Sequence, residues 1–346
     1  IQDTCRRVDL RFGLDYGARG SAHLGGALST NAGGFQALRY GVARDQVLGL
    51  ECVLANGTVL SHLVPYPKDN TGYDLKHLFI GSEGTLGVIT KAVLRLHPAP
   101  STTSTALMAF DSFDAVARTL NRMRRGLAGT LSSFEIMWNE FFDFNVRAVF
   151  GERAPIGLGH PFYAICEAEG FEPDGDAAMF EAALGTALET GDIADAVIAQ
   201  SSRQRLELWK IREDFEAEMA LFRVMVDFDV SLPISRMNAF AQEARQALDR
   251  DVPDNLGLHI IGHLGDCNLH VTTGVPAADQ VKAVKDTIYQ LIAHHGGSIS
   301  AEHGIGLAKR DYLHHSRSAA ELGAMRALKA TFDPNGILNP GKILPL

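Results

Sequence analysis

The sequence predicts an α+β protein with a strand-rich first part and a second part that combines an antiparallel sheet with helices. Residues 1–98 hold glycine-rich turns between apolar, strand-like runs. The segment 97–100, His-Pro-Ala-Pro, is the strongest break in the chain, and strand and helix patterns alternate beyond it. We therefore expect a first domain over 1–98, a second over 99–330, and a turn-rich tail over 331–346 that folds back onto another domain.

Composition narrows the class of protein. The chain has 346 residues, 46% of them hydrophobic and 21% charged, which is ordinary for a globular protein of two or three domains. A formal net charge of −9 argues against nucleic acid or an anionic membrane surface as partner. The four dispersed cysteines suit a reducing compartment, so we expect a cytoplasmic protein, or a mitochondrial matrix protein in a eukaryote. No apolar run approaches the length of a membrane span.

Two glycine-rich segments mark the first domain. Residues 21–34, SAHLGGALSTNAGG, would let backbone N–H groups approach a pyrophosphate without clashing Cβ atoms. Residues 81–96 repeat this logic, with a glycine-rich turn that leads into a strand. Between them, Asn56-Gly57 predicts a hairpin that joins apolar runs. The spacing fits neither a Rossmann fold nor a P-loop, and turns alone could also explain such glycines.

The second domain is expected to alternate strands and helices. Asp111 would cap a helix that ends near Gly126, and Pro233 would stop a strand. The expected strands cover 103–110, 162–168 and 222–232. The expected helices cover 111–125, 175–190, 201–220, 234–248 and 277–295. This order predicts an antiparallel sheet with helices on one face.

The segment 262–270, GHLGDCNLH, reads as a hairpin within that domain because apolar runs flank a short polar turn. If Asp266 and Cys267 form a two-residue turn, His263 lies directly opposite His270. Directly opposed residues have Cβ atoms about 5 Å apart, so the two imidazoles could bind one metal ion.

The segment 301–304, Ala-Glu-His-Gly, supplies two more candidate residues. Glu302 offers an oxygen ligand, and two histidines with one carboxylate and an open position are typical of a catalytic metal site. His303 would then be free to act as a base. The alternative is that these are surface or hydrogen-bonded histidines, because the chain has 13 of them.

Five motifs together resemble one known family. They are SAHLGGALSTNAGG at 21–34, TGYDLKHLFIGSEGTLGVIT at 71–90, GHLGDCNLH at 262–270, AEHGIG at 301–306 and NPGKIL at 339–344. Their order and content resemble the FAD-linked oxidases and dehydrogenases of the vanillyl-alcohol-oxidase fold, and among them the D-2-hydroxy acid dehydrogenases. The resemblance implies part of an FAD-binding domain followed by an α+β cap domain that binds the substrate. It also implies an N-terminal lobe, with a further pyrophosphate loop, ahead of Ile1.

The resemblance assigns roles to individual residues. His263, His270 and Glu302 match the metal ligands, usually of zinc, and His303 matches the catalytic base. Arg212 matches the arginine that binds the substrate carboxylate. Asn268 and Thr272 are expected beside the substrate. The residues expected to contact FAD are Gly25, Gly26, Thr30, Asn31, Gly33, Gly34, Gly84, Gly87, Val88, Ile89 and Asn339.

The implied activity is the metal-assisted, FAD-dependent oxidation of a D-2-hydroxy acid, such as D-2-hydroxyglutarate or D-lactate, to the 2-oxo acid. Electrons would pass to an acceptor such as an electron-transfer flavoprotein or a quinone. A homodimer stays open. Two alternatives also stay open: a flavin-free metal hydrolase, and a non-catalytic fragment or subunit that needs a partner lobe to bind FAD.

Three residues depart from the family pattern. Relatives usually have glycine at the position of Cys267. Relatives specific for D-2-hydroxyglutarate carry a lysine at the position of Asp227 and an asparagine at the position of Thr272. The two last differences leave the particular 2-hydroxy acid undecided.

Overall fold

The computed structural model describes residues 1–345 and divides the chain into two compact units. The first unit consists of Ile1–Ala99 together with the described residues from Ser298 onward, and the second unit is Pro100–Gly297. One boundary lies in the His-Pro-Ala-Pro segment. The other differs from the expected division, because residues 298–330 belong to the first unit rather than to the second. No helix in residues 1–345 is long and apolar enough to cross a membrane.

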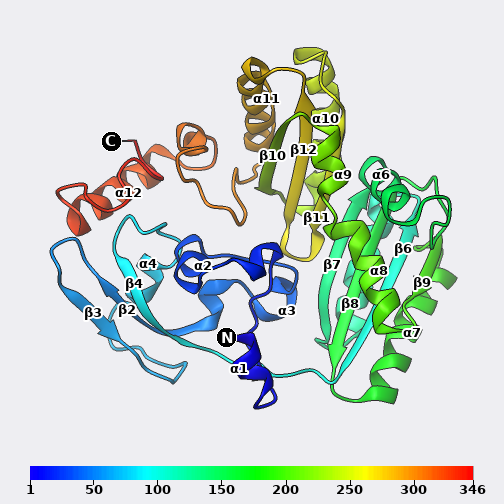
Figure 1. Ribbon diagram of the computed structural model, residues 1–346, viewed down its shortest axis with the longest axis horizontal. Coiled ribbons are helices and arrows are strands. Elements are labelled where there is room, and N and C mark those ends of the chain that lie inside the picture. The colour runs from blue at the N-terminus through cyan, green and yellow to red at the C-terminus, as the bar shows by residue number, and fades with distance from the viewer. Residues whose placement is uncertain (346) are drawn as a thin grey trace. The chain divides into compact units, whose positions relative to one another are not determined.

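The first unit is built on a three-stranded antiparallel sheet in the order β3-β2-β4 (Figure 1). The Asn56-Gly57 turn joins β2 to β3, as its sequence predicts. The strands of this unit are β1 (Leu10–Arg11), β2 (Val47–Val53), β3 (Val59–His62), β4 (Val88–Leu94) and β5 (His97–Pro98). Its α-helices are α1 (Gln2–Arg6), α2 (Leu24–Thr30), α3 (Ala37–Tyr40), α4 (Lys76–Phe79) and α12 (Ala319–Phe332).

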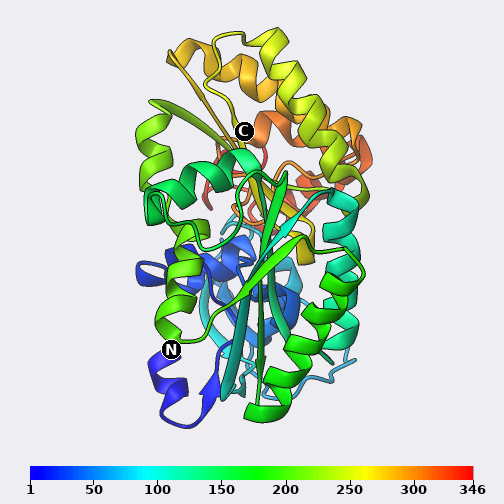
Figure 2. The same ribbon diagram turned by 90° about the vertical axis from the view of Figure 1, so that its right-hand side faces the viewer.

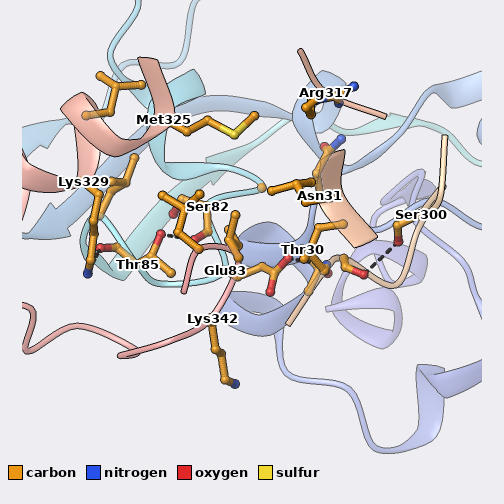
Figure 3. Close-up of a pocket in the computed structure, with 18 of the residues that line it drawn as sticks. Thr30, Asn31, Ser82, Glu83, Thr85, Ser300, Arg317, Met325, Lys329 and Lys342 are labelled. Carbon is orange, nitrogen blue, oxygen red and sulfur yellow. Dashed lines mark hydrogen bonds between the residues drawn. The ribbon is translucent and has the colours of Figure 1, made fainter. Parts of the chain in front are cut away.

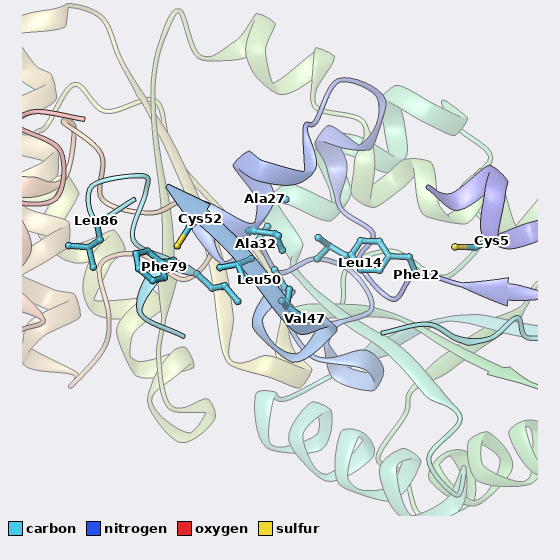
Figure 4. Packing of buried hydrophobic residues seen from close by; sticks show 13 residues of the cluster. Cys5, Phe12, Leu14, Ala27, Ala32, Val47, Leu50, Cys52, Phe79 and Leu86 are labelled. Atoms are coloured by element: carbon cyan, nitrogen blue, oxygen red, sulfur yellow. The ribbon is translucent and has the colours of Figure 1, made fainter. Parts of the chain in front are cut away.

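The core of the first unit gathers apolar side chains from the glycine-rich segments and the sheet (Figure 4). Leu28 of α2 and Phe79 of α4 are almost fully buried there. Phe332 at the end of α12 packs edge-on against Phe79, with ring centroids 5.6 Å apart. This contact helps explain why the C-terminal segment belongs to the first unit.

The second unit is built on a seven-stranded sheet in the order β10-β12-β11-β7-β8-β6-β9, and every neighbouring pair is antiparallel (Figure 1). The predicted antiparallel sheet is therefore confirmed. Its strands are β6 (Thr102–Phe110), β7 (Leu131–Trp138), β8 (Phe162–Gly170), β9 (Asp195–Ile198), β10 (Val224–Ser231), β11 (Leu258–His263) and β12 (Asn268–Val275). Its helices are α5 (Phe113–Gly126), α6 (Asn139–Phe150), α7 (Pro173–Glu189), α8 (Ser202–Glu213), α9 (Glu216–Leu221), α10 (Ile234–Asp251) and α11 (Val281–His294).

Helices cover both faces of this sheet, so the expectation of helices on one face is wrong. Phe113 of α5 packs against Trp138 of β7, whereas Phe142 of α6 stacks on Tyr163 of β8. Trp138 and Tyr163 point to opposite faces, because Trp138 pairs directly with Phe162, the neighbour of Tyr163. Figure 2 shows helices on both sides of the sheet.

Three local predictions in the second unit need correction. Ser112, not Asp111, caps α5, because its side chain accepts a hydrogen bond from the backbone N–H of Ala115. The single helix expected over 201–220 is interrupted between α8 and α9. The strands β7 and β9 and the helix α6 were not predicted.

Candidate functional site

The two hairpin histidines share one face of the second unit's sheet, in a register that differs from the expected one. His263 pairs with Asn268 and His270 pairs with Ile261, so His263 does not lie directly opposite His270. The shift is two residues, and a shift of two keeps both side chains on the same face. The imidazole centroids are 5.2 Å apart, with the ring planes at 81°. The pair can therefore still present two nitrogen atoms to one ion.

The turn explains the shifted register. Residues Leu264–Asp266 form a short 3₁₀ helix, and Cys267 follows with φ 70° and ψ 22°. The loop thus uses four residues where a two-residue turn was expected. Cys267 holds a left-handed conformation that glycine adopts more readily. Burial raises the pKa of its thiol.

A residue that sequence analysis missed lies behind the histidines. Glu135 of β7 pairs directly with His263 in the β7–β11 ladder, and its Oε1 lies 2.7 Å from His263 Nδ1. The Nε–H of Arg212 donates to Glu135 Oε2 at 3.1 Å. One carboxylate thus joins a predicted metal ligand to the predicted substrate arginine. A lone glutamate inside the apolar run LSSFEIMW was the available signal.

Arg212 occupies its place because two buried glutamates hold α8 against the sheet. Glu167 of β8 accepts two hydrogen bonds from Arg205, each of 2.7 Å, and one of 2.9 Å from Trp209. Arg205, Trp209 and Arg212 follow one another at four- and three-residue spacing, so they share a side of the helix. Arg212 is 2% exposed, so its side chain is buried within the second unit.

Asn268 and Thr272 lie on the same sheet face as the histidines. Each is two positions from His270 along β12, and every second residue of a strand points to the same face. Asn268 is buried, and neither of its amide atoms has a hydrogen-bond partner among the described residues. Thr272 stands opposite Asp227 of β10. A buried amide without partners is costly unless a ligand or water satisfies it.

Glu302 and His303 belong to the first unit. A Cβ atom at Gly33 would come within 2.7 Å of Glu302 Oε1, so two residues with predicted roles are neighbours. Glu83, which was not predicted, fixes the loop around them: its carboxylate accepts the backbone N–H groups of Ile305 at 2.6 Å and Gly306 at 2.8 Å.

Several of the glycines that are expected to contact FAD are also required for packing, because a Cβ atom at these positions would clash with a neighbouring group. A Cβ atom at Gly34 would lie 2.1 Å from the Asp15 carbonyl, and one at Gly87 would lie 2.9 Å from the Phe79 ring. Gly84 has φ 69°, and a Cβ there would meet the side chain of Asn339. In contrast, a Cβ at Gly25 or Gly26 would meet nothing within 4 Å, so their backbone is open to a bound group.

The remaining predicted cofactor residues also belong to the first unit. Asn31 ends α2 in a left-handed conformation and accepts the backbone N–H of Arg44 at 2.9 Å. The hydroxyl of Thr30 donates to the Gly26 carbonyl at 3.2 Å. Val88 and Ile89 begin β4, where Val88 is half exposed.

Thr30 and Asn31 line a cavity of about 610 Å³ within the first unit. Figure 3 shows it between the glycine-rich segments and the C-terminal segment, with Lys329 and Arg317 among its lining residues. Lys329 donates to the carbonyls of Thr85 and Leu338, each at 2.8 Å, which fixes one wall. Glu83, Glu302 and Asp333 also line the cavity, so its lining combines cationic, anionic and polar groups.

Comparison with solved structures supports the class of fold. 4-Ethylphenol oxidase from Gulosibacter chungangensis superimposes with a TM-score of 0.69 at 19% identity, covering 99% of this chain and 74% of the oxidase. The mixed helix and sheet architecture with antiparallel sheets is that of flavoproteins with the vanillyl-alcohol-oxidase fold.

Sequence comparison gives the family. Residues 99–343 match the C-terminal domain of FAD linked oxidases, and residues 1–62 match an FAD binding domain. The chain is 41% identical over 336 residues to a probable mitochondrial D-2-hydroxyglutarate dehydrogenase of Oryza sativa subsp. indica, and 42% identical over 334 residues to the mitochondrial D-2-hydroxyglutarate dehydrogenase of Bos taurus. Each match covers 96% of this chain, but only 59% of the rice protein and 60% of the cattle protein. The chain belongs to the FAD-linked oxidase family.

Proposed function

We propose that the protein takes part in the FAD-dependent, metal-assisted oxidation of a D-2-hydroxy acid to the 2-oxo acid. The observation that carries the proposal is the pair of imidazoles of His263 and His270, with centroids 5.2 Å apart on one sheet face. The relatives reported above, which are named as D-2-hydroxyglutarate dehydrogenases (a probable one in rice), support this class of substrate. D-2-hydroxyglutarate, D-lactate and similar acids are all candidates.

The first unit would contribute to FAD binding. FAD supplies a two-electron acceptor when it is bound. The open backbone at Gly25 and Gly26 supports a role in this binding, as does the match to an FAD binding domain. The other proposed contacts are Thr30, Asn31, Gly33, Gly34, Gly84, Gly87, Val88, Ile89 and Asn339.

The histidines would bind a divalent metal, and zinc fits a site with two nitrogen ligands. Such a metal supplies Lewis acidity toward a hydroxyl group. The residues present fit this role, because Glu135 holds His263 through Nδ1 and so directs its Nε2 away from the carboxylate. Glu302 as the oxygen ligand and His303 as the base stay predictions from the sequence.

Arg212 would bind the substrate carboxylate. A guanidinium presents a fork of N–H donors that matches the two oxygens of a carboxylate. The partnerless amide of Asn268 would hydrogen-bond the substrate, and Thr272 would lie beside it. These contacts would fix which face of the α-carbon the acid presents.

The electron acceptor and the compartment belong to the same proposal. An electron-transfer flavoprotein or a quinone would reoxidise the flavin. The rice and cattle relatives are named as mitochondrial proteins, so we propose the mitochondrial matrix for a eukaryotic source and the cytoplasm otherwise.

The visible spectrum of the purified protein, recorded without oxygen while D-2-hydroxy acids are added one at a time, tests the proposal. We expect a flavin spectrum that bleaches with one acid and not with its L-enantiomer. The variant His303→Ala should bind as much metal but bleach far more slowly, because it lacks the base. A flavin that no D-2-hydroxy acid bleaches, or hydrolysis of esters by a colourless protein, would contradict the proposal.

A further inference from the structure

Glu135 lies between two other buried side chains of the second unit, the Arg212 guanidinium and the His263 imidazole. Its two carboxylate oxygens receive different partners: His263 Nδ1 lies 2.7 Å from Oε1, and Arg212 Nε lies 3.1 Å from Oε2. The exposed fractions of Glu135, Arg212 and His263 are 1%, 2% and 5%. A charge this deeply buried is tolerated only when it is paired, so the three groups depend on one another.

Three separate elements fix this junction. All residues of β7 are buried, and Glu135 faces His263 across the ladder to β11. Helix α8 presents Arg212, and Glu167 anchors that helix one and two turns earlier through Trp209 and Arg205. The Glu135 carboxylate therefore has little freedom to turn toward another partner.

We propose that Glu135 is a positioning residue, which sets both the tautomer of His263 and the direction of the Arg212 guanidinium through one carboxylate. The inference rests on the proposed function, because it concerns how the metal ligand and the substrate arginine are prepared. In the proposed function Glu135 only holds His263. Here it is also given a role toward Arg212.

The chemistry follows from the donors and acceptors present. Arginine keeps its proton in proteins and can only donate, so the carboxylate accepts from Arg212. The same anionic group accepts from His263, which places the imidazole hydrogen on Nδ1. Neutral His263 then presents an unprotonated Nε2, the form that binds a metal.

The Glu135 carboxylate also couples the proposed metal ligand His263 to the proposed substrate-binding residue Arg212. Because Arg212 and His263 share one anion, a shift of either partner changes the hydrogen bond to the other. A substrate carboxylate held by Arg212 and a metal held by His263 would thus be set in a fixed relation by one side chain. We call this set of three residues the Arg-Glu-His junction.

Glu135→Gln tests the proposal, because an amide is nearly the same size but has only one acceptor atom. Its NH₂ group must face either Arg212 or His263, and facing His263 favours the tautomer with hydrogen on Nε2. We expect the affinity for Zn²⁺, measured by competition with a chromophoric chelator, to fall about 10- to 100-fold.

Glu218→Gln is the matched control. Glu218 is equally buried and bonds His259 Nδ1 at 2.8 Å, four residues before His263 on the same strand. It makes the same kind of glutamate–histidine hydrogen bond away from His263, so replacing Glu218 should leave the Zn²⁺ affinity unchanged. Circular dichroism and the thermal midpoint would show that both variants are folded.

A second measurement does not depend on the Glu135→Gln variant. Nitrogen NMR of the metal-free wild-type protein, with ¹⁵N-labelled histidine and the His263 signal assigned by its loss in His263→Gln, should show hydrogen on Nδ1. Hydrogen on Nε2, or equal Zn²⁺ affinity for wild type and Glu135→Gln, overturns the inference and leaves the proposed function standing. A wild-type protein that binds no Zn²⁺ overturns both.

Discussion

At the scale of single residues, the conformation of Cys267 explains why the predicted register of the β11–β12 hairpin was wrong. The segment GDCN favours a two-residue turn, and that turn would place His263 opposite His270. The structure instead closes the loop with four residues and puts Cys267 at φ 70°. Sequence could identify both histidines and their shared face, because a two-residue shift preserves the face. It could not fix the register, since the choice of turn depends on the strands on either side.

Replacing Cys267 with glycine should stabilise the protein. The left-handed conformation costs a residue with a side chain about 1–2 kcal/mol, and the greater freedom of glycine in the unfolded chain offsets part of the gain. We expect a net increase of about 0.5–1 kcal/mol in the free energy of unfolding, measured by urea denaturation. Cys267→Ala keeps the strain and serves as control. A glycine variant no more stable than the alanine variant would show that Cys267 is not strained.

At the scale of elements, the sequence predicted the helices and strands with clear punctuation and missed those without it. Strand β10 ends at Ser231, ahead of the predicted stop at Pro233, and β6 lies within one residue of its expected start. The stretch LSSFEIMW of β7 mixes serines and a glutamate into an apolar run, so it has neither strict alternation nor a continuous apolar pattern. Its glutamate is buried because of its long-range partners Arg212 and His263, which no local pattern reveals.

A carboxylate that ties two helices of the second unit together should make stability depend on pH. Asp192, just beyond α7, accepts from Arg118 Nε at 2.7 Å and from Arg122 Nη2 at 3.1 Å, both on α5. The hydrogen bond from Arg118 is the largest influence that lowers the pKa of Asp192. A lowered pKa in the folded state adds stability above the unfolded value of about 4, and this is lost as the pH falls through the folded value.

Asp192→Asn should therefore be less stable than wild type at pH 7, and the difference should shrink as the pH falls below about 4. Urea unfolding midpoints at pH 7 and pH 3 would measure it. Asp254→Asn removes an exposed carboxylate and should change little at either pH. A difference between wild type and Asp192→Asn that is the same at both values would argue against this ion pair.

At the scale of the whole molecule, the break in the chain at 97–100 could be predicted from the sequence, because prolines interrupt both helices and strands. The sequence could not show that residues 298–330 belong to the first unit. That depends on contacts such as those of Glu83 with Ile305 and Gly306, which lie more than 200 positions away along the chain. The family resemblance supplied a role for Arg212 that composition and spacing alone did not.

All four cysteines are free, and only Cys267 is not buried. Burial raises the pKa of the Cys52 thiol to about 11 and also raises that of Cys166. Since the thiolate is the reactive form, we expect Ellman's reagent at pH 8 to react slowly with the native protein, beginning with Cys267, and to count four thiols in urea. Cys267→Gly should lack the first phase. Rapid reaction of several native thiols would contradict the burial.

The pairing of β7 with β11 has a consequence for the order in which parts of the chain can fold. The ladder pairs only three residues of each strand, and it joins Glu135 to His263, which lie 128 positions apart. During synthesis, β6 to β9 and helix α8 leave the ribosome well before β11. Arg212 is therefore made before His263, so it would be the first of the two partners available to Glu135. His263 would then join a carboxylate that already has a partner.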